Sequence, residues 1–287
     1  MIGYRLAGQD FYFSWPVPEL EPFETTGMQA VDAGSAATFV RPTFQNGERR
    51  QLQGWVGSAQ RSVEVHDTPR GLLLKVEGCN DFLISPRGET IGKPDSQEPF
   101  SALEREILAG PAMVLALALR DVWSLHASAA IFNDHMIAFL GESGQGKSTL
   151  AAYLSQNPGW RLAADDILPA TIESSGAVVW PRFPQLKLAT NTQPGIHLPE
   201  QLPLKVICVL TPAEPDRMPE LQKISGAQTA QALLSHIAGT RMFNTALLAK
   251  HLAFSTQAAQ QITAYRLIHP HRRDTLPLVK EFLETIC

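Results

Sequence analysis

The stretch Gly141-Glu142-Ser143-Gly144-Gln145-Gly146-Lys147-Ser148 matches the pattern G-x-x-x-x-G-K-[ST] of a phosphate-binding loop in full. The apolar run 135–140 before it predicts a buried strand, and residues 148–156 after it have the spacing of a helix. Between a strand and a helix, the glycines allow a tight turn and the helix N-terminus adds positive potential. The stretch therefore predicts a site for the phosphates of a nucleotide.

Two side chains of the loop have chemistry of their own. Lys147 can reach the terminal phosphates, and the hydroxyl of Ser148 can bind Mg²⁺. The residues expected to hold the nucleotide are Gly141, Glu142, Ser143, Gly144, Gln145, Gly146, Lys147, Ser148 and Thr149. The alternative is an incidental glycine turn, which would require neither the flanking strand nor the helix.

Two adjacent carboxylates, Asp165-Asp166, follow a predicted buried strand over 160–164. In P-loop folds such a strand end lies beside the metal and the γ-phosphate. Neighbouring side chains at a strand end point in different directions, so one carboxylate can hold Mg²⁺ or its water while the other faces the acceptor. A carboxylate placed there can accept a hydroxyl proton. The alternative is an Asp-Asp turn without chemistry.

His126 lies in the apolar run Leu125-His126-Ala127-Ser128-Ala129, which belongs to a strand-like stretch over 122–132. A lone histidine on an apolar strand is usually a core residue whose ring is hydrogen-bonded. Asn133-Asp134 predicts the turn from this stretch into the strand that leads to the loop.

Composition limits the class of protein. The chain has 287 residues, which suits one large domain or two modest ones, and its net charge of −4 gives no general basic field for nucleic acid. The two basic clusters, Arg49-Arg50 and 269–273, are interpreted as solvated surface. Three distant cysteines predict no disulfide framework or zinc site and fit a reducing compartment. The apolar run 107–119 is too short to span a bilayer, so we expect a cytoplasmic protein with no nucleic-acid or membrane partner.

The chain divides by composition near the polar link 92–99. Residues 1–98 predict a small β-rich domain with an antiparallel meander over 62–91, and residues 99–287 predict the domain that contains the loop. The second domain opens with a capping box at Ser101 and Glu104, and Gly110-Pro111 is expected to kink the helix that follows. Further predicted elements are strands over 177–180, 203–210 and 264–269, helices over 229–238 and 244–262, a loop-rich region over 181–199, and a terminal helix capped at Asp274-Thr275.

The order of these motifs resembles a known family. His126 to Ala129, a β-hairpin, the loop 141–149 and the strand end 162–166 together resemble the catalytic domain of HPr kinase/phosphorylase. They resemble the HPr-kinase-like serine kinases more closely, some of which accompany lasso-peptide biosynthesis. The segment 180–188 is similar to a proline-flanked segment of that branch. The resemblance implies an α/β (α+β) P-loop domain of the HPr kinase C-terminal, PEP-carboxykinase-like type.

The resemblance also implies roles. It makes Asp166 the general base, with His126, Lys147 and Asp165 beside it, and it implies Mg²⁺ at Ser148 and Asp165. The family's arginine near the phosphate is matched to Arg241, with Arg182 as the next candidate. The glycine-rich signature around the family's metal-binding glutamate is not found, and Glu173 lies outside any such motif.

The expected activity is an ATP-dependent kinase, with GTP as the alternative nucleotide. Its acceptor is a serine-type hydroxyl on a peptide or small protein, and residues 1–98 are the candidate for recognising that acceptor. The resemblance further implies a homo-oligomer. Two other functions remain open: a regulator that hydrolyses ATP slowly and signals by binding a partner, and a kinase for a small metabolite.

Overall fold

A computed structural model describes residues 1–25, 42, 47–56, 58–94, 98–184 and 198–287. The described chain forms two compact units. Unit 1 consists of 1–122 and 239–249, and unit 2 consists of 123–238 and 250–287. The sequence-based division between residues 98 and 99 rests on composition rather than on contacts, and it stays a prediction.

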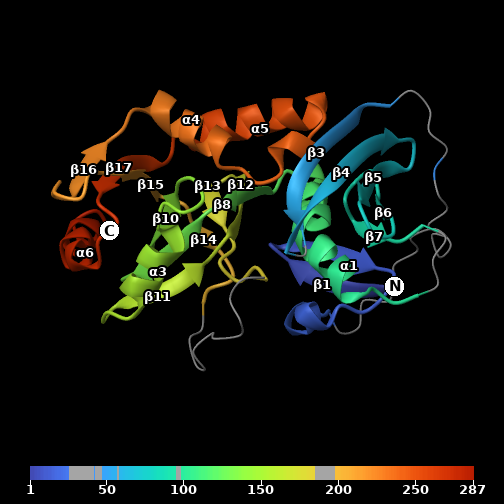
Figure 1. Ribbon diagram of the computed structural model, residues 1–287, viewed down its shortest axis with the longest axis horizontal. Coiled ribbons are helices and arrows are strands. Elements are labelled where there is room, and N and C mark those ends of the chain that lie inside the picture. Colours follow the sequence, from blue (N-terminus) through green and yellow to red (C-terminus); the bar gives the residue numbers. More distant parts are fainter. Residues whose placement is uncertain (26–41, 43–46, 57, 95–97, 185–197) are drawn as a thin grey trace. The chain divides into compact units, whose positions relative to one another are not determined.

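Unit 1 is built on a seven-stranded sheet with the order β1-β2-β7-β6-β5-β4-β3 (Figure 1). Its strands are β1 (Ile2–Leu6), β2 (Gln9–Phe13), β3 (Arg49–Val56), β4 (Ala59–Thr68), β5 (Gly71–Val76), β6 (Phe82–Ile84) and β7 (Thr90–Gly92). The run from β4 to β7 is the predicted antiparallel meander, and β3, which was not predicted, adds an antiparallel strand next to β4. The pairing of β2 with β7 is parallel and joins the first hairpin to the meander.

Among the helices of unit 1, α1, η2 and α2 follow the predicted signals, whereas η1 and η3 were not predicted. These elements are η1 (Pro18–Phe23), α1 (Ala102–Ile107), η2 (Leu108–Ala112), α2 (Met113–Leu119) and η3 (Thr240–Met242). Both hydrogen bonds of the capping box are present, since Ser101 Oγ accepts from the amide of Glu104 and the Glu104 carboxylate accepts from the amide of Ser101. The predicted kink is confirmed, because Gly110 before Pro111 has non-helical backbone angles.

Unit 2 contains a six-stranded sheet with the order β11-β9-β10-β15-β17-β16. Its strands are β9 (Ser128–Phe132), β10 (His135–Leu140), β11 (Trp160–Ala164), β15 (Val206–Pro212), β16 (Glu220–Lys223) and β17 (Thr263–His269). Strands β10, β15 and β17 are parallel neighbours, and β9 lies antiparallel between β10 and β11. Therefore β10, β11, β15 and β17 all end at one edge of the sheet.

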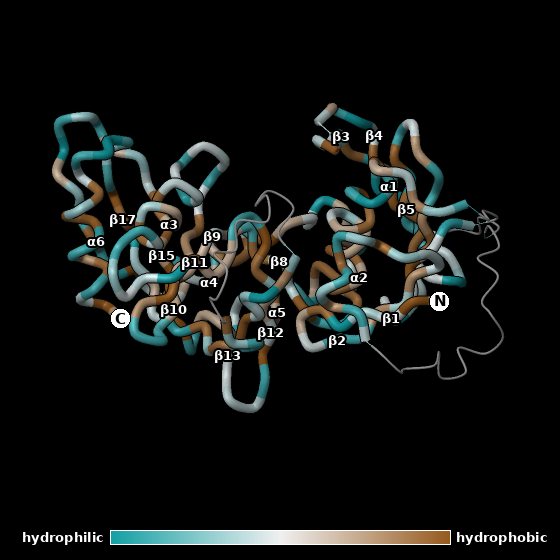
Figure 2. Tube along the Cα trace, turned by 90° about the horizontal axis from the view of Figure 1, so that it is seen from below, coloured by the Kyte–Doolittle hydropathy of each residue, from teal (hydrophilic) through white to brown (hydrophobic). Residues whose placement is uncertain are grey.

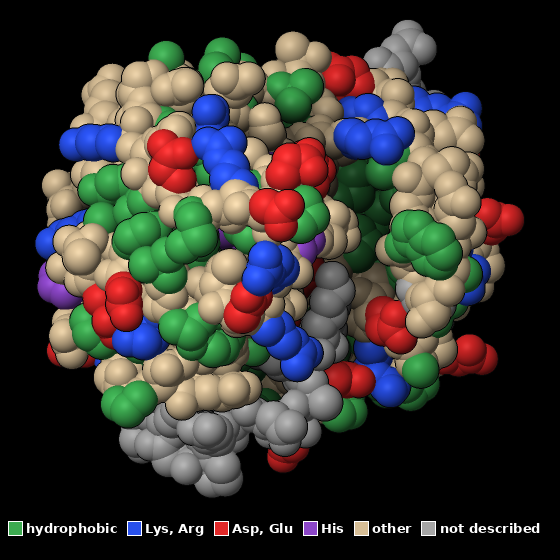
Figure 3. Space-filling view, turned by 60° about the vertical axis from the view of Figure 1, so that its left-hand side comes forward, with side chains coloured by type: hydrophobic (Ala, Val, Ile, Leu, Met, Phe, Trp, Pro, Cys, Tyr) green, Lys and Arg blue, Asp and Glu red, His purple; other side chains and the backbone are tan. Residues whose placement is uncertain are grey.

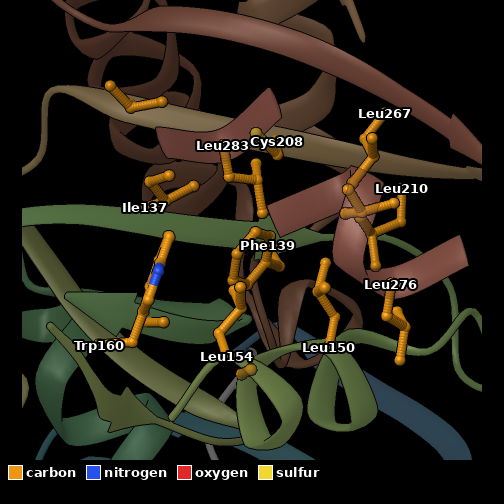
Figure 4. Close-up of a cluster of buried hydrophobic side chains, with 14 residues drawn as sticks. Ile137, Phe139, Leu150, Leu154, Trp160, Cys208, Leu210, Leu267, Leu276 and Leu283 are labelled. Carbon is orange, nitrogen blue, oxygen red and sulfur yellow. The ribbon is translucent and has the colours of Figure 1, made fainter. Parts of the chain in front are cut away.

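Two helices, α3 (Lys147–Ser155) and α6 (Leu276–Glu284), bury their apolar sides against this sheet. Figure 4 shows the cluster, in which Phe139 of β10 lies between Leu154 of α3 and Leu283 of α6, while Leu150 lies near Leu276. Burial of these side chains is the main source of stability here, at about 25 cal/mol per Å². In Figure 2 the hydrophobic segments gather in the strands and helices of each unit.

A second sheet in unit 2 has the order β14-β13-β12-β8. Its strands are β8 (Trp123–His126), β12 (Ile167–Glu173), β13 (Gly176–Val179) and β14 (Leu202–Pro203). The expectation of one strand-like run over 122–132 is wrong, because the chain leaves one sheet and enters the other at Ala127. The predicted turn at Asn133-Asp134 is confirmed, and both residues have a positive φ.

The remaining helices of unit 2 differ from the predictions at their ends. Helix α4 (Gly226–Ser235) was expected over 229–238, and α5 (Thr245–Ala258), which begins in unit 1, was expected over 244–262. The predicted side-chain cap of the terminal helix is wrong. Thr275 donates its hydroxyl to the carbonyl of Arg272 within the short turn η4 (Arg273–Thr275), and Asp274 pairs with Arg272.

The described residues include no helix long and apolar enough to cross a membrane. Most of the predicted loop-rich region 181–199, and part of the segment 180–188, lie outside the described residues. On the face shown in Figure 3, acidic and basic side chains are interspersed.

Candidate active site

The glycine-rich loop joins the end of β10 to the first turn of α3. Gly144 and Gly146 have φ of 85° and 86°, and Gly146 is the N-cap of the helix. A Cβ added to either glycine would meet no atom within 4 Å. The left-handed backbone, rather than a lack of space, is therefore what favours glycine at both positions.

Lys147 is buried, at 7% exposed, and its ammonium group lies inside the loop. Its Nζ donates to the carbonyl oxygens of Gly141 at 2.7 Å and Glu142 at 3.1 Å. The side chain of Gln145 adds a further bond within the loop, because its Oε1 accepts from the amide of Glu142 at 2.8 Å. These bonds hold the loop in a compact ring around a positive charge, which is an arrangement suited to an anion.

Asp165 meets the first turn of α3. Its Oδ1 accepts hydrogen bonds from Ser148 Oγ at 2.6 Å and from Ser128 Oγ at 2.7 Å. The two hydroxyl oxygens lie 3.4 Å apart. One carboxylate and two hydroxyls from β9, α3 and the end of β11 thus meet at the carboxyl edge of the sheet.

Asp166 has a different partner. Its Oδ1 lies 3.3 Å from Nδ1 of His126, and both side chains are partly exposed, at 23% and 34%. The φ of Asp166 is 90°, a conformation that costs a non-glycine residue energy and that occurs often at functional sites. The carbonyl of Asp166 accepts from the amide of Ala127, and Ile167 pairs with His126 across β12 and β8. The strained backbone is therefore held from both sides.

His236 lies beside this pair, and sequence reasoning missed it. The segment 236–238 runs along β8, since the amide of His126 donates to the carbonyl of His236 at 2.7 Å and Leu125 forms a bridge with Ile237. This pairing places His236 opposite His126. Burial lowers the pKa of His236; Glu142 opposes that shift, whereas the charges of Lys147 and His126 add to it. The charges that act on the His236 ring thus belong to the loop and to His126.

Comparisons with known proteins find likenesses among solved structures. No family model and no curated protein matches the chain. A solved structure, the HPr(Ser) kinase/phosphatase from Coxiella burnetii, is similar with a TM-score of 0.33 and 15% identity, over 58% of this chain and 95% of that one. A likeness at this level carries no argument about function. The functional argument therefore rests on the geometry of the site.

The other candidate residues are placed as follows. Arg241 lies in η3 and is exposed, but it belongs to unit 1, whereas the loop and both aspartates belong to unit 2. Arg182 is exposed after β13, and Glu173 at the end of β12 accepts from Gln201 Nε2. Thr149 is exposed in the first turn of α3, beside Ser148. The structure thus brings together His126, Lys147, Ser148, Asp165 and Asp166 in unit 2.

The donor set near Ser148 fits Mg²⁺. Within the described part of the chain, no group of three or more His, Cys, Asp or Glu side chains could hold a metal ion. Mg²⁺ does not need such a group, because it usually keeps several waters and is bound by one or two carboxylates together with substrate phosphates. Asp165 and the hydroxyl of Ser148, next to the loop, supply the protein's share of those ligands.

Proposed function

We propose that this chain is a Mg²⁺-dependent kinase that transfers the γ-phosphoryl group of ATP to a serine-type hydroxyl of a peptide or small protein. One observation supports this most directly. Two consecutive aspartates at the end of β11 have separate partners: Asp165 binds the hydroxyls of Ser128 and Ser148, and Asp166 pairs with His126. One carboxylate is thereby available to a metal ion and the other to a proton.

The loop would hold the nucleotide. Its amides and the N-terminus of α3 face the phosphates, and Lys147 exchanges its bonds to the carbonyls of Gly141 and Glu142 for bonds to phosphate oxygens. Ser148 and Asp165 would hold Mg²⁺, which neutralises the charge that develops on the transferred group. Positioning and charge stabilisation account for most of the catalysis of this kind of reaction.

Asp166 would be the general base. It takes the proton of the acceptor hydroxyl as that oxygen forms its bond to the γ-phosphorus and as the bond between phosphorus and the ADP oxygen breaks. His126 orients this carboxylate through the 3.3 Å contact. The strained φ of Asp166 points to the same role, because it fixes a side chain that ordinary strand geometry would turn elsewhere.

The proposal includes the finer fold type, a P-loop domain like that of HPr kinases and PEP carboxykinases. It rests on the resemblance of residues 126–129, 141–149 and 162–166. The β-rich N-terminal region would recognise the acceptor, because its sequence contains no catalytic motif and its composition differs from that of the rest of the chain.

The experiment follows the label of γ-labelled ATP in the presence of MgCl₂. The purified chain is incubated with a library of serine-containing peptides, with a metabolite extract freed of protein, or with no acceptor. We expect label on peptide serine. Label only on a metabolite would indicate a small-metabolite kinase, and label only in inorganic phosphate would indicate a regulatory ATPase; either result would contradict the proposed acceptor.

A further inference from the structure

The sheet order of unit 2 gives the bound nucleotide a direction. Asp165 and Ser128, which would face the metal and the γ-phosphate, lie at the β9–β11 side of the loop. Strands β15 and β17 lie on the opposite side of β10. With its γ-phosphate toward β11, a nucleoside triphosphate held by the loop extends its α-phosphate and nucleoside toward β15 and β17.

The chain after β17 reaches the same edge of the sheet. Gly141 lies against β15, since a Cβ added to it would be 3.4 Å from Cβ of Leu210. Leu210 belongs to one cluster with Leu150 of α3 and Leu276 of α6, as Figure 4 shows. Leu276 directly follows the segment 270–275, so this segment lies beside the loop end of α3. The strands β10 and β17 are two strand spacings apart, about 10 Å, which a ribose and its base can cover.

This segment is tied to the loop after β15. Arg272 donates to the carbonyl of Pro215 at 3.0 Å, and the amide of Ala213 donates to the carbonyl of His269 at 3.1 Å. Arg272 also forms an ion pair with Asp274. Its guanidinium group is thus engaged in holding the two loops together. Only a held loop can present a ligand-binding side chain in a fixed position.

Within the held segment, an exposed ring lies against a buried one. His271 is exposed, and the centroid of its ring is 5.8 Å from that of His269. His269 is buried, and its Nδ1 lies 3.1 Å from the carbonyl of Pro270. The buried ring therefore supports the exposed one, and an exposed, supported aromatic ring is a surface on which a nucleobase can stack.

We propose that the segment 270–273 forms the nucleoside end of the nucleotide site and that His271 contacts the base of ATP. This inference rests on the proposed function, because it requires a nucleotide on the loop. It also gives the cluster His269 to Arg273, which sequence reasoning interpreted as solvated surface, a specific role. Stacking uses the face of a base rather than its hydrogen-bonding edge. The contact should therefore hold ATP and GTP about equally well.

The test compares two ligands by calorimetry with MgCl₂: ATP, and tripolyphosphate, which has the phosphates without the nucleoside. We expect His271→Ala to weaken ATP and GTP binding about tenfold and to leave tripolyphosphate binding unchanged. His135→Ala is the matched control, because His135 is also exposed but begins β10 at the opposite edge of the sheet. It should change none of these affinities.

Three results would contradict the inference. If His271→Ala leaves ATP affinity unchanged, His271 does not contact the base. If it weakens ATP and tripolyphosphate equally in a folded protein, the segment acts on the phosphate loop rather than on the nucleoside. If the unsubstituted chain binds neither ligand, the proposed function itself is wrong. This outcome differs from the first two, in which the unsubstituted chain still binds ATP.

Discussion

The hydroxyl of Ser148, in the first turn of α3, donates to Oδ1 of Asp165 at 2.6 Å, across 17 residues of sequence. The same oxygen accepts from Ser128, which begins β9. Three segments of the chain thus converge on one carboxylate beside the phosphate loop. A carboxylate held in this way is oriented before any ligand arrives, which reduces the cost of forming a metal site.

Asp165→Asn should weaken the Mg²⁺ dependence of nucleotide binding. The amide is similar in shape but carries no charge, and a charged hydrogen-bond acceptor is worth about 1.5–3 kcal/mol. We therefore expect the Mg²⁺ concentration for half-maximal ATP binding to rise about tenfold or more, while ATP binding without Mg²⁺ is unchanged. Calorimetric titrations at several MgCl₂ concentrations would measure this. An unchanged Mg²⁺ requirement would show that Asp165 does not face the metal.

Asp166→Asn should remove phosphoryl transfer and leave nucleotide binding intact, because the amide cannot accept the hydroxyl proton. The loss in kcat should be about 10²–10⁴-fold, the usual contribution of a positioned general base. Rates come from the label-transfer assay, and affinities come from calorimetry on the same preparation. The two variants form a matched pair of neighbouring residues. If Asp166→Asn keeps full kcat while binding is lost, the two roles are assigned to the wrong aspartates.

The local signals around the loop predicted its surroundings well. The apolar run before the glycines is β10, the helix after them is α3, and the strand before the aspartates is β11. These predictions succeeded because each element is fixed by short-range patterns, namely apolar periodicity and turn residues. The pairing of both aspartates with different partners was likewise expected from alternation at a strand end.

Other parts could not be predicted because they depend on contacts distant in sequence. The break at Ala127 separates two sheets, and no turn residue marks it. Strand β12 was missed, since Pro169 normally argues against a strand; here it pairs at Ser124 within the sheet. His236 becomes part of the site only because its segment pairs with β8, more than a hundred residues earlier. No local pattern contains that information.

Trp55→Ala should test the role proposed for the N-terminal region. Trp55 lies on β3 of unit 1 and is 79% exposed. Exposed tryptophans that a partner covers are frequent hot spots of binding. We expect the KM for a peptide acceptor to rise about tenfold or more, with the KM for ATP unchanged. Met218→Ala is the control, because Met218 is 66% exposed but lies in unit 2. Equal acceptor KM values for both variants and the unsubstituted chain would refute this role for Trp55.

Breaking the buried ion pair between Lys93 and Glu104 should destabilise unit 1. Nζ of Lys93 lies 3.3 Å from Glu104 Oε2, and the two side chains are only 1% and 5% exposed. Glu104 also accepts from Asn80 and from the amide of Ser101. Lys93→Met removes one charge and leaves the other buried, which should destabilise the unit by about 3–5 kcal/mol. Urea unfolding would measure the loss of stability of the whole chain, and hydrogen exchange at the strands of unit 1 would show that the loss lies in that unit.

The same pair predicts a pH dependence with a definite sign. Burial raises the pKa of Glu104, but hydrogen bonds from Ser101 and Asn80 and the charge of Lys93 outweigh burial, so the pKa in the folded state lies below its ordinary value of 4.5. A lowered pKa means that the ionised group stabilises the folded state above pH 4.5, and that this stability is lost as the pH falls through the folded-state pKa. Glu104→Gln, which cannot ionise, should therefore be less stable than the unsubstituted chain at pH 7, and the difference should narrow below pH 4.5. The free energy of unfolding of both proteins would be measured at pH 7 and at pH 3, on either side of about 4.5. If the difference between them is the same at both pH values, the charge of Glu104 contributes nothing to stability.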